Sequence, residues 1–171
     1  MPLTIREELL SDIVAIRAVN DSAFGQPQEG RLVDLLRDND AISLSLVAVS
    51  DDRVIGHVLY SPVSIDAGDR AIVGVGLGPV SVQPEFQRIG VGRRLIEAGI
   101  AEFERQGVPY MVVLGHPQYY PRFGFEPASR WSIRCEWEVP DPAFMIRVFD
   151  PQRLATVTGV VRYRPEFAAV G

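Results

Sequence analysis

The chain has 171 residues, a formal net charge of -5 at pH 7 and a hydrophobic fraction of 47%. These values predict one compact domain with a sizeable core, and the negative charge argues against nonspecific nucleic-acid binding. All 17 basic residues are arginine, which excludes a Walker-type phosphate loop, a Schiff-base enzyme and a protein kinase of the usual kind, because each needs a lysine.

The cysteine, the histidines and the length of the apolar runs indicate where the protein is located and what it does not bind. The single cysteine, Cys135, cannot form an internal disulfide, and with His57 and His116 it makes no metal-ligand spacing. Residues 1–12 lack the apolar stretch of a signal peptide, and no apolar run approaches the roughly 18 residues of a membrane span. We therefore expect a cytoplasmic protein that binds no metal, no nucleic acid and no membrane.

The first half of the chain predicts two helices and an antiparallel sheet. In chain order we expect a strand at Leu3–Glu7, an amphipathic helix from Ile13 with Ser11–Asp12 as its N-cap, a helix at Gly30–Arg37, and strands at Ile42–Leu46, Val54–Tyr60 and Ala71–Val82. The first of these three strands alternates apolar and polar residues with a period of two. Turn-like segments at Asp51–Arg53 and Asp66–Asp69 join the three strands, which predicts an antiparallel meander.

The periodicity changes in the second half. Apolar residues recur every 3.6 positions from Gly92 to Arg105, which predicts an amphipathic helix, and Gly107 suits its C-terminus. Tyr110–Leu114 is a continuous apolar run, as expected of a strand buried on both faces. The strand ending at Val82, the helix and this strand predict a parallel, right-handed βαβ unit. Further strands are expected around Phe125, Ala143–Phe149 and Val160–Tyr163, so the class is a mixed α/β sheet in a single domain over 1–171.

The segment between the strand and the helix is the candidate anion site. Gly90 and Gly92 stand where the helix begins, so the backbone can approach a ligand without interference from a Cβ. The N–H groups of a first helical turn point outward at the positive end of the helix dipole. Arg88, Arg93 and Arg94 add positive charge, with no acid between positions 87 and 94. From these residues alone, an anion site and a tight strand-to-helix turn both remain open.

Two motifs resemble those of the GNAT superfamily of N-acetyltransferases. Gln87-x-x-Gly90-x-Gly92 is similar to the R/Q-x-x-G-x-G/A pyrophosphate loop of that family, and Tyr120-x-x-x-Gly124-Phe125 is similar to its Y-x-x-x-G-F ending. The segments Gly76–Val82 and Val139–Met145 resemble a bacterial subgroup of predicted acetyltransferases. The resemblance covers about residues 3–127 at the superfamily level, with C-terminal strands in 128–171, and nearly the whole chain at the subgroup level.

The resemblance implies a GNAT-like fold in which two central strands splay apart, with acetyl-CoA as co-substrate in the opening. The backbone groups of Val80 and Val82 would bind the pantetheine arm, and the Val82 N–H would polarise the thioester carbonyl. The loop that would bind the pyrophosphate comprises Gln87, Arg88, Ile89, Gly90, Val91, Gly92 and Arg93.

The implied reaction is direct attack of a substrate amine on the thioester, with Tyr120 as the general acid that protonates the CoA thiolate. Core packing in a short helix is the alternative for Tyr120, Tyr119 is the second candidate acid, and Pro121 predicts a departure from regular helix here. The strand Ala71–Val82 contains no acid or histidine. The general base therefore stays open between His116, which could also be a structural histidine, and ordered water.

The expected function is an N-acetyltransferase that acts on a primary amine of a small molecule or a peptide. A non-catalytic acyl-CoA-binding or sensing module and a structural interaction protein are the alternatives, and a homodimer stays open. No motif encodes the acceptor. We expect its site to be shaped by the region around Phe24–Arg37 and by the segment after Ala128.

Overall fold

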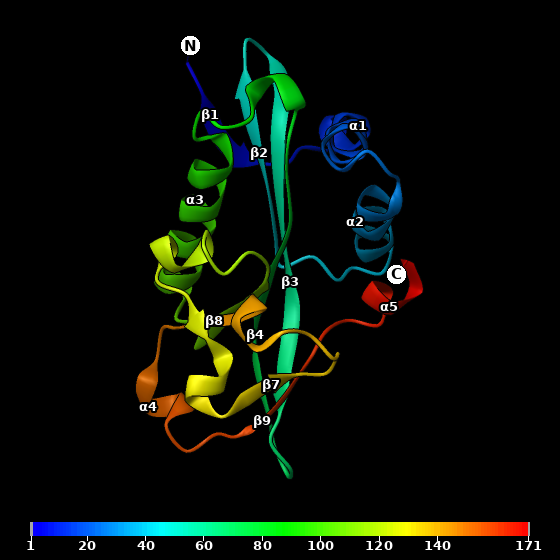
Figure 1. Ribbon diagram of the computed structural model, residues 1–171. Coiled ribbons are helices and arrows are strands. Elements are labelled where there is room, and N and C mark those ends of the chain that lie inside the picture. The colour runs from blue at the N-terminus through cyan, green and yellow to red at the C-terminus, as the bar shows by residue number, and fades with distance from the viewer. Residues whose placement is uncertain (1, 171) are drawn as a thin grey trace. The chain divides into compact units, whose positions relative to one another are not determined.

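The computed structural model describes residues 2–170 and divides into two compact units. Unit 1 contains the described residues up to Ser61, Gly78–Glu102 and those from Pro165 onward, and unit 2 contains Pro62–Leu77 and Phe103–Arg164. Three elements contribute residues to both units: β3 (Arg53–Asp66), β4 (Ala71–Val82) and α3 (Val91–Gln106) (Figure 1).

The sheet of unit 1 is antiparallel. β1 (Thr4–Glu7) pairs with β2 (Leu44–Ser50), and β2 pairs with β3 in the register Leu44↔Tyr60. Asp51 and Asp52, in the turn between β2 and β3, have φ angles of 49° and 60°, the backbone conformation that tight hairpins require. The antiparallel pairing predicted for the first two strands of the meander is confirmed.

β2 differs from its prediction in bounds. It begins at Leu44 rather than at Ile42 and extends to Ser50. Although apolar and polar residues alternate here, Ser45 is buried, as are Leu44 and Leu46. Helices cover both faces of this sheet, so the polar side chain is inside the protein.

On one face, α1 (Ile13–Phe24), α2 (Gln28–Asp38) and α5 (Glu166–Val170) pack against the sheet (Figure 1). Their apolar side chains form a core with Val47 and Leu59. On the other face, α3 packs so closely that a Cβ at Gly56 would lie 3.0 Å from a methyl group of Val91. The sheet of unit 1 is therefore buried between two layers of helix.

A 3-10 turn, η1 (Leu10–Asp12), precedes α1. Asp12 lies at the N-cap position, as predicted, although its side chain makes no capping bond to α1. The carboxylate instead accepts hydrogen bonds from the Leu9 N–H and from Arg6, both at 2.7 Å. The hydrogen bond from Arg6 is the main reason why the pKa of Asp12 lies below its ordinary value.

Tyr60 and Gly99 fit together within unit 1. The Tyr60 hydroxyl donates to the carbonyl groups of Leu95 and Ile96, at 3.4 Å and 3.2 Å. A Cβ at Gly99 would lie 2.0 Å from that hydroxyl oxygen. Glycine is therefore required at this position by close packing, although alanine is the better helix former.

Unit 2 contains the parallel pair that the sequence predicts. β4 pairs in parallel with β5 (Tyr110–Leu114) in the register Val75↔Met111. β8 (Phe144–Val148) pairs antiparallel with β5, and β6 (Glu126–Pro127) pairs with β8. β9 (Gly159–Arg162) pairs with the C-terminal part of β3 and with β7 (Ile133–Cys135), a short strand that the sequence analysis does not predict. The remaining short elements are η2 (Pro84–Phe86), η3 (Tyr120–Phe123), η4 (Ala128–Trp131), η5 (Asp141–Ala143) and α4 (Pro151–Leu154).

The core of unit 2 is built around Tyr110. Its ring is fully buried, its hydroxyl donates to the Ile72 carbonyl at 2.6 Å, and a Cβ at Gly74 would lie 2.5 Å from the ring.

Among residues 2–170, no helix combines the length and the apolar character that a membrane span requires.

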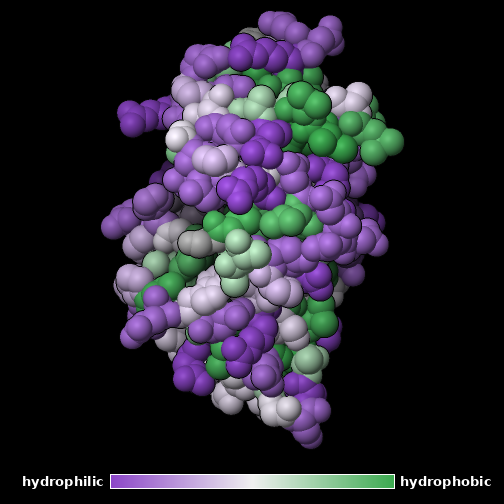
Figure 2. Space-filling view, turned by 90° about the vertical axis from the view of Figure 1, so that its right-hand side faces the viewer, coloured by the Kyte–Doolittle hydropathy of each residue, from purple (hydrophilic) through white to green (hydrophobic). Residues whose placement is uncertain are grey.

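Hydrophilic residues cover much of the face in Figure 2, and hydrophobic residues appear between them in patches. Leu9, Leu10 and Val14, around the start of α1, are 55%, 88% and 83% exposed. Such side chains contribute little to the core, so their apolar character does not stabilise unit 1.

Candidate functional site

The loop that follows β4 in unit 1 has an open, exposed backbone. After η2, residues Gln87–Gly90 are exposed, and φ is positive at Arg88 (66°) and at Gly90 (92°). The Gln87 side chain donates to the Val82 carbonyl at 2.9 Å, which ties the start of the loop to the end of β4. The sequence predicts this loop, but it does not predict the hydrogen bond from the Gln87 side chain to Val82.

The loop ends at the N-terminus of α3. The hydrogen bond from the Arg94 N–H to the Gly90 carbonyl, at 3.1 Å, is the first of the helix. The N–H groups of Gly90, Val91, Gly92 and Arg93 therefore precede the helical ladder and have no carbonyl partner within it. Because the helix dipole is positive here, these N–H groups can bind an anion.

The three arginines of this region are not equivalent. Arg93 forms an ion pair with Glu97 at 2.8 Å, and Arg94 donates to the Leu3 carbonyl at 3.1 Å. Arg88 is exposed and has no side-chain partner among residues 2–170. The charge available to a ligand at this loop therefore comes mainly from Arg88 and the helix N-terminus.

In unit 2, Tyr120 opens the short 3-10 turn η3, as the following Pro121 predicts. Its ring lies edge-on to those of Tyr119 and Phe125, with centroids 5.1 Å and 5.9 Å away. Burial, with a smaller contribution from Tyr119, raises the pKa of Tyr120 to about 12. The hydroxyl is therefore protonated at neutral pH, and it makes no hydrogen bond to a described residue.

His116 follows β5 in the same unit. Its carbonyl accepts hydrogen bonds from the N–H groups of Tyr119 and Tyr120, at 3.0 Å and 3.4 Å. Its side chain is exposed, and its ring has no partner in the described part of the chain. The backbone thus brings His116 and Tyr120 together, whereas Val80, Val82 and the loop residues belong to unit 1.

Comparison with protein families gives a direct match at this point. Residues 4–128 match the acetyltransferase (GNAT) domain, a span that includes the loop and Tyr120. The chain belongs to the GNAT family of N-acetyltransferases.

Bacterial relatives resemble this acetyltransferase over nearly its whole length. The uncharacterized N-acetyltransferase YhbS of Escherichia coli (strain K12) is 34% identical over 166 residues, which are 96% of this chain and 98% of the relative. The uncharacterized N-acetyltransferase YjhQ of the same strain is 41% identical over 159 residues, 89% of this chain and 87% of the relative.

Two solved structures share the fold. A crystal structure of Escherichia coli YhbS in complex with CoA matches with a TM-score of 0.91 and 34% identity, covering 99% of this chain and 93% of that one. A GNAT family acetyltransferase from Brucella melitensis in complex with acetyl-CoA matches with a TM-score of 0.81 and 36% identity, covering 97% and 98%. The predicted mixed α/β GNAT fold and its parallel β4–β5 pair are confirmed.

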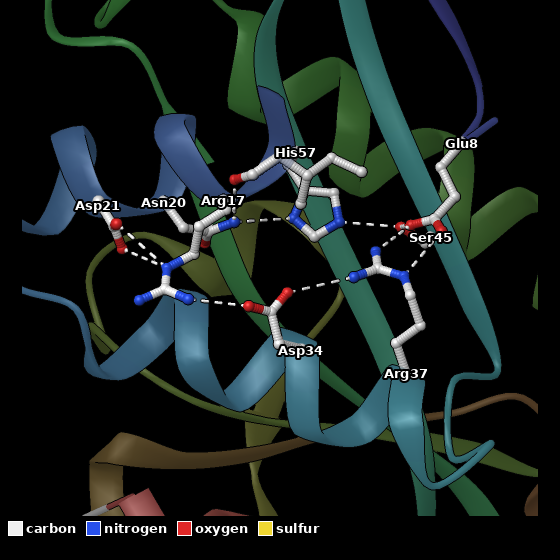
Figure 3. Close-up of polar contacts among 9 residues, drawn as sticks. Glu8, Arg17, Asn20, Asp21, Asp34, Arg37, Ser45 and His57 are labelled. Carbon is white, nitrogen blue, oxygen red and sulfur yellow. Dashed lines mark hydrogen bonds and ion pairs between the residues drawn. The ribbon is translucent and has the colours of Figure 1, made fainter. Parts of the chain in front are cut away.

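A buried polar cluster in unit 1 of this acetyltransferase is not predicted by its sequence (Figure 3). His57, on β3, is fully buried, and its Nε2 lies 2.9 Å from the Ser45 hydroxyl. The Asn20 amide donates to the Ile16 carbonyl at 3.0 Å and lies 3.2 Å from His57 Nδ1. The Ser45 hydroxyl donates to the Glu8 carboxylate.

These contacts fix the proton positions in the cluster. Because the Asn20 amide nitrogen is a donor, His57 Nδ1 accepts, and the ring proton resides on Nε2, which donates to Ser45. His57 therefore cannot accept the Ser45 proton, as the histidine of a nucleophilic serine pair must. Burial, and to a lesser extent the charge of Arg37, lowers the pKa of His57 to about 3. The cluster is a structural network and not a second catalytic site.

Ion pairs extend the same network across the two helices (Figure 3). Arg37 pairs with Glu8 at 2.7 Å and with Asp34 at 3.5 Å. Arg17 pairs with Asp34 at 2.8 Å and with Asp21 at 3.1 Å. These ion pairs link Glu8, α1 and α2 to the hydrogen bonds of Ser45 on β2 and His57 on β3. From the sequence, only the position of His57 in a strand could have been predicted.

Two cavities each lie within a single unit. The cavity of unit 1, about 380 Å³, lies beside the polar cluster; its lining is Glu7, Glu8, Arg37, Asp40, Ile42, Ser43, Leu44 and Ser45. The cavity of unit 2 is about 240 Å³ and is lined by β7 and the segment that follows it.

Among residues 2–170, no group of three or more histidine, cysteine or acidic side chains could hold a metal ion.

Proposed function

We propose that this N-acetyltransferase transfers the acetyl group of acetyl-CoA to a primary amine by direct attack. The observation that carries the proposal is the N-terminus of α3, where the N–H groups precede the helical ladder, with the Gln87–Arg93 loop, within a chain of this family. The CoA and acetyl-CoA complexes of the two related structures support the choice of co-substrate.

The loop would bind the pyrophosphate of acetyl-CoA. The N–H groups from Gly90 to Arg93 supply hydrogen-bond donors, and Arg88 adds a charge that no described residue neutralises. The backbone of Val80 and Val82 would bind the pantetheine arm, and the Val82 N–H would polarise the thioester carbonyl. The hydrogen bond from the Gln87 side chain to the Val82 carbonyl would hold the loop against the end of β4.

Tyr120 would act as the general acid. The amine nitrogen attacks the carbonyl carbon, the C–S bond breaks, and the Tyr120 hydroxyl gives its proton to the leaving sulfur. A phenol with a pKa of about 12 is a weak donor toward an ordinary thiolate. The leaving thiolate would form in similarly desolvated surroundings, which raise its basicity as well.

His116 is the proposed base that takes the proton from the amine, directly or through a water molecule. Its exposed ring and its backbone contacts with Tyr120 support this role. Because residues of both units have roles in this reaction, we propose that 1–171 functions as one domain.

A non-catalytic acyl-CoA-binding module is the second candidate, and the absence of an acid or histidine on β4 favours it. Calorimetric titration with CoA, combined with detection of thiol released from acetyl-CoA in the presence of a panel of amines, distinguishes the two. An enzyme binds CoA and releases thiol with at least one amine, whereas a sensing module binds CoA and releases none.

A further inference from the structure

The cavity of unit 2 lies in the C-terminal segment, outside the residues that the proposed function uses. It lies between β7, η5 and the first residue of β8. Its volume, about 240 Å³, is below the range of roughly 300–1,000 Å³ that is typical of sites for drug-sized ligands. The lining residues are Ser129, Ile133, Arg134, Cys135, Trp137, Glu138, Val139, Asp141 and Phe144.

One part of this lining is apolar and rigid. Ile133 and Phe144 belong to the buried core of unit 2, and Val139 packs against it. Trp137 is stacked on Tyr163, with ring centroids 4.8 Å apart and an interplanar angle of 23°. Such a surface can hold a ring or a branched aliphatic group without losing side-chain freedom on binding.

The polar part of the lining carries an excess of negative charge. Glu138 and Asp141 are exposed acids, and Arg134 is the one basic residue of the lining. The Ser129 hydroxyl donates to Asp141 at 3.0 Å, which orients that carboxylate. A ligand with a positive charge is favoured over an anionic one.

The cavity is joined to Tyr120 through the backbone of the same unit. Phe144 pairs with Leu114, and the Gly115 N–H donates to the Ala143 carbonyl at 2.9 Å. The ring of Tyr120 packs on Gly115, where a Cβ would lie 2.4 Å from the ring. Phe144, in the wall of the cavity, is therefore paired with the end of β5, and the ring of Tyr120 packs on the residue that follows β5.

The cavity of unit 1 also has more acids than bases in its lining, but it has no aromatic residue. Of its acids, Glu8 is already engaged by Arg37 and Ser45, so that group has little capacity left for a ligand. Of these two cavities, that of unit 2 offers an aromatic surface together with its acids.

We propose that the cavity of unit 2 binds the acceptor, and that the acceptor is a small primary amine with a single ring or a branched aliphatic body. The apolar body would lie against Trp137 and Phe144, and Asp141 and Glu138 would attract the amine in its ammonium form, which would lose a proton to His116 before the nitrogen attacks the thioester. This inference rests on the proposed function for the identity of the ligand as the acceptor, but the binding itself requires neither acetyl-CoA nor catalysis.

The first experiment measures binding alone. Cys135 lines the cavity and is the single cysteine of the chain. Because burial raises the pKa of its thiol, its alkylation by iodoacetamide is followed at about pH 9, where the rate reports whether the cavity is occupied. Phenethylamine should slow the alkylation in a saturable manner, phenethyl alcohol should slow it much less, and glutathione in the same solution should be unaffected. Equal protection by the alcohol, or no protection by the amine, would overturn the proposal.

The second experiment measures kinetics with phenethylamine as the acceptor. Asp141→Asn and Glu138→Gln should each raise the KM for the amine about three- to tenfold and leave the KM for acetyl-CoA unchanged. Arg134→Gln should lower the KM for the amine. Asp69→Asn, which removes an exposed acid of unit 2 outside the cavity, is the matched control and should have no effect.

The two experiments separate this inference from the proposed function. Protection of Cys135 without thiol release by any amine would leave the cavity as an amine site and contradict acetyl transfer. Thiol release with other amines, without protection of Cys135 by phenethylamine, would support acetyl transfer and overturn the inference.

Discussion

His57 Nε2 donates a hydrogen bond to the Ser45 hydroxyl at 2.9 Å, and the ring is fully buried in its neutral form. The neutral ring is required because Nδ1 accepts a hydrogen bond from the Asn20 amide and so cannot carry a proton. A protonated ring would also carry a positive charge that is buried away from water and repelled by Arg37.

This relationship predicts a pH dependence of stability. The pKa of His57 is about 3 in the folded protein against 6.5 in the unfolded chain, so the unfolded chain binds more protons between these values. The free energy of unfolding should therefore fall as the pH falls from 6.5 toward 3, by about 2 kcal/mol on reaching about pH 5. Urea unfolding at a series of pH values measures this.

His57→Gln is the matched control, because glutamine can donate to Ser45 and accept from Asn20 but does not titrate. Its free energy of unfolding should be nearly flat between about pH 5 and pH 6.5. Parallel pH profiles of the two proteins would contradict the account of His57.

Gly99→Ala should destabilise the protein by about 1–3 kcal/mol, because the added methyl group would lie 2.0 Å from the Tyr60 hydroxyl. Gly30→Ala in α2 is the comparison. There the added methyl group meets the outer parts of the partly exposed side chains of Arg17 and Asp21, which can move aside. Thermal or urea unfolding measures both, and equal losses of stability would count against the packing argument.

Gly92→Glu should abolish CoA binding in calorimetry, because it places a bulky negative side chain beside the N–H groups proposed to bind the pyrophosphate. Gly92→Gln has the same bulk without the charge and should retain part of the affinity. Micromolar affinity in the Gly92→Glu protein would remove the loop from the binding site.

Tyr120→Phe should lower kcat by about 10²-fold or more, with a smaller effect on the KM for acetyl-CoA. Tyr119→Phe is the matched control, since it removes the neighbouring hydroxyl and keeps the ring that packs on Tyr120. Because the pKa of Tyr120 is about 12, the wild-type rate should show no loss of this acid at any pH below about 10. Unchanged turnover in Tyr120→Phe, or a larger loss in Tyr119→Phe, would contradict the assignment.

Much of the fold is predictable from the sequence because its strongest signals are local. The 3.6-residue period of α3 and the apolar run Tyr110–Leu114 predict the parallel unit with nearly correct bounds. β7 is missed because Ile133–Cys135 is too short to show a period, and it forms only through pairing with β9.

The site is predictable only where a motif is contiguous. The Gln87–Gly92 loop and Tyr120 carry such motifs. By contrast, Glu8 follows β1, Ser45 lies on β2 and His57 lies on β3, so these residues share no spacing. The alternation around Ser45 indicates a strand but not that this side chain is buried, because the pattern cannot show that helices cover both faces. The cavity beside Trp137 likewise depends on tertiary contacts of the C-terminal segment.

The most direct test of the account is the ratio of N-acetylated amine to free CoA formed from acetyl-CoA, with the intact mass of the protein recorded in the same reaction. Direct transfer predicts one acetylated amine per CoA released and an unmodified chain, which has no lysine to acetylate. CoA release without acetylated amine, or an acetylated protein that forms before the product, would contradict direct transfer.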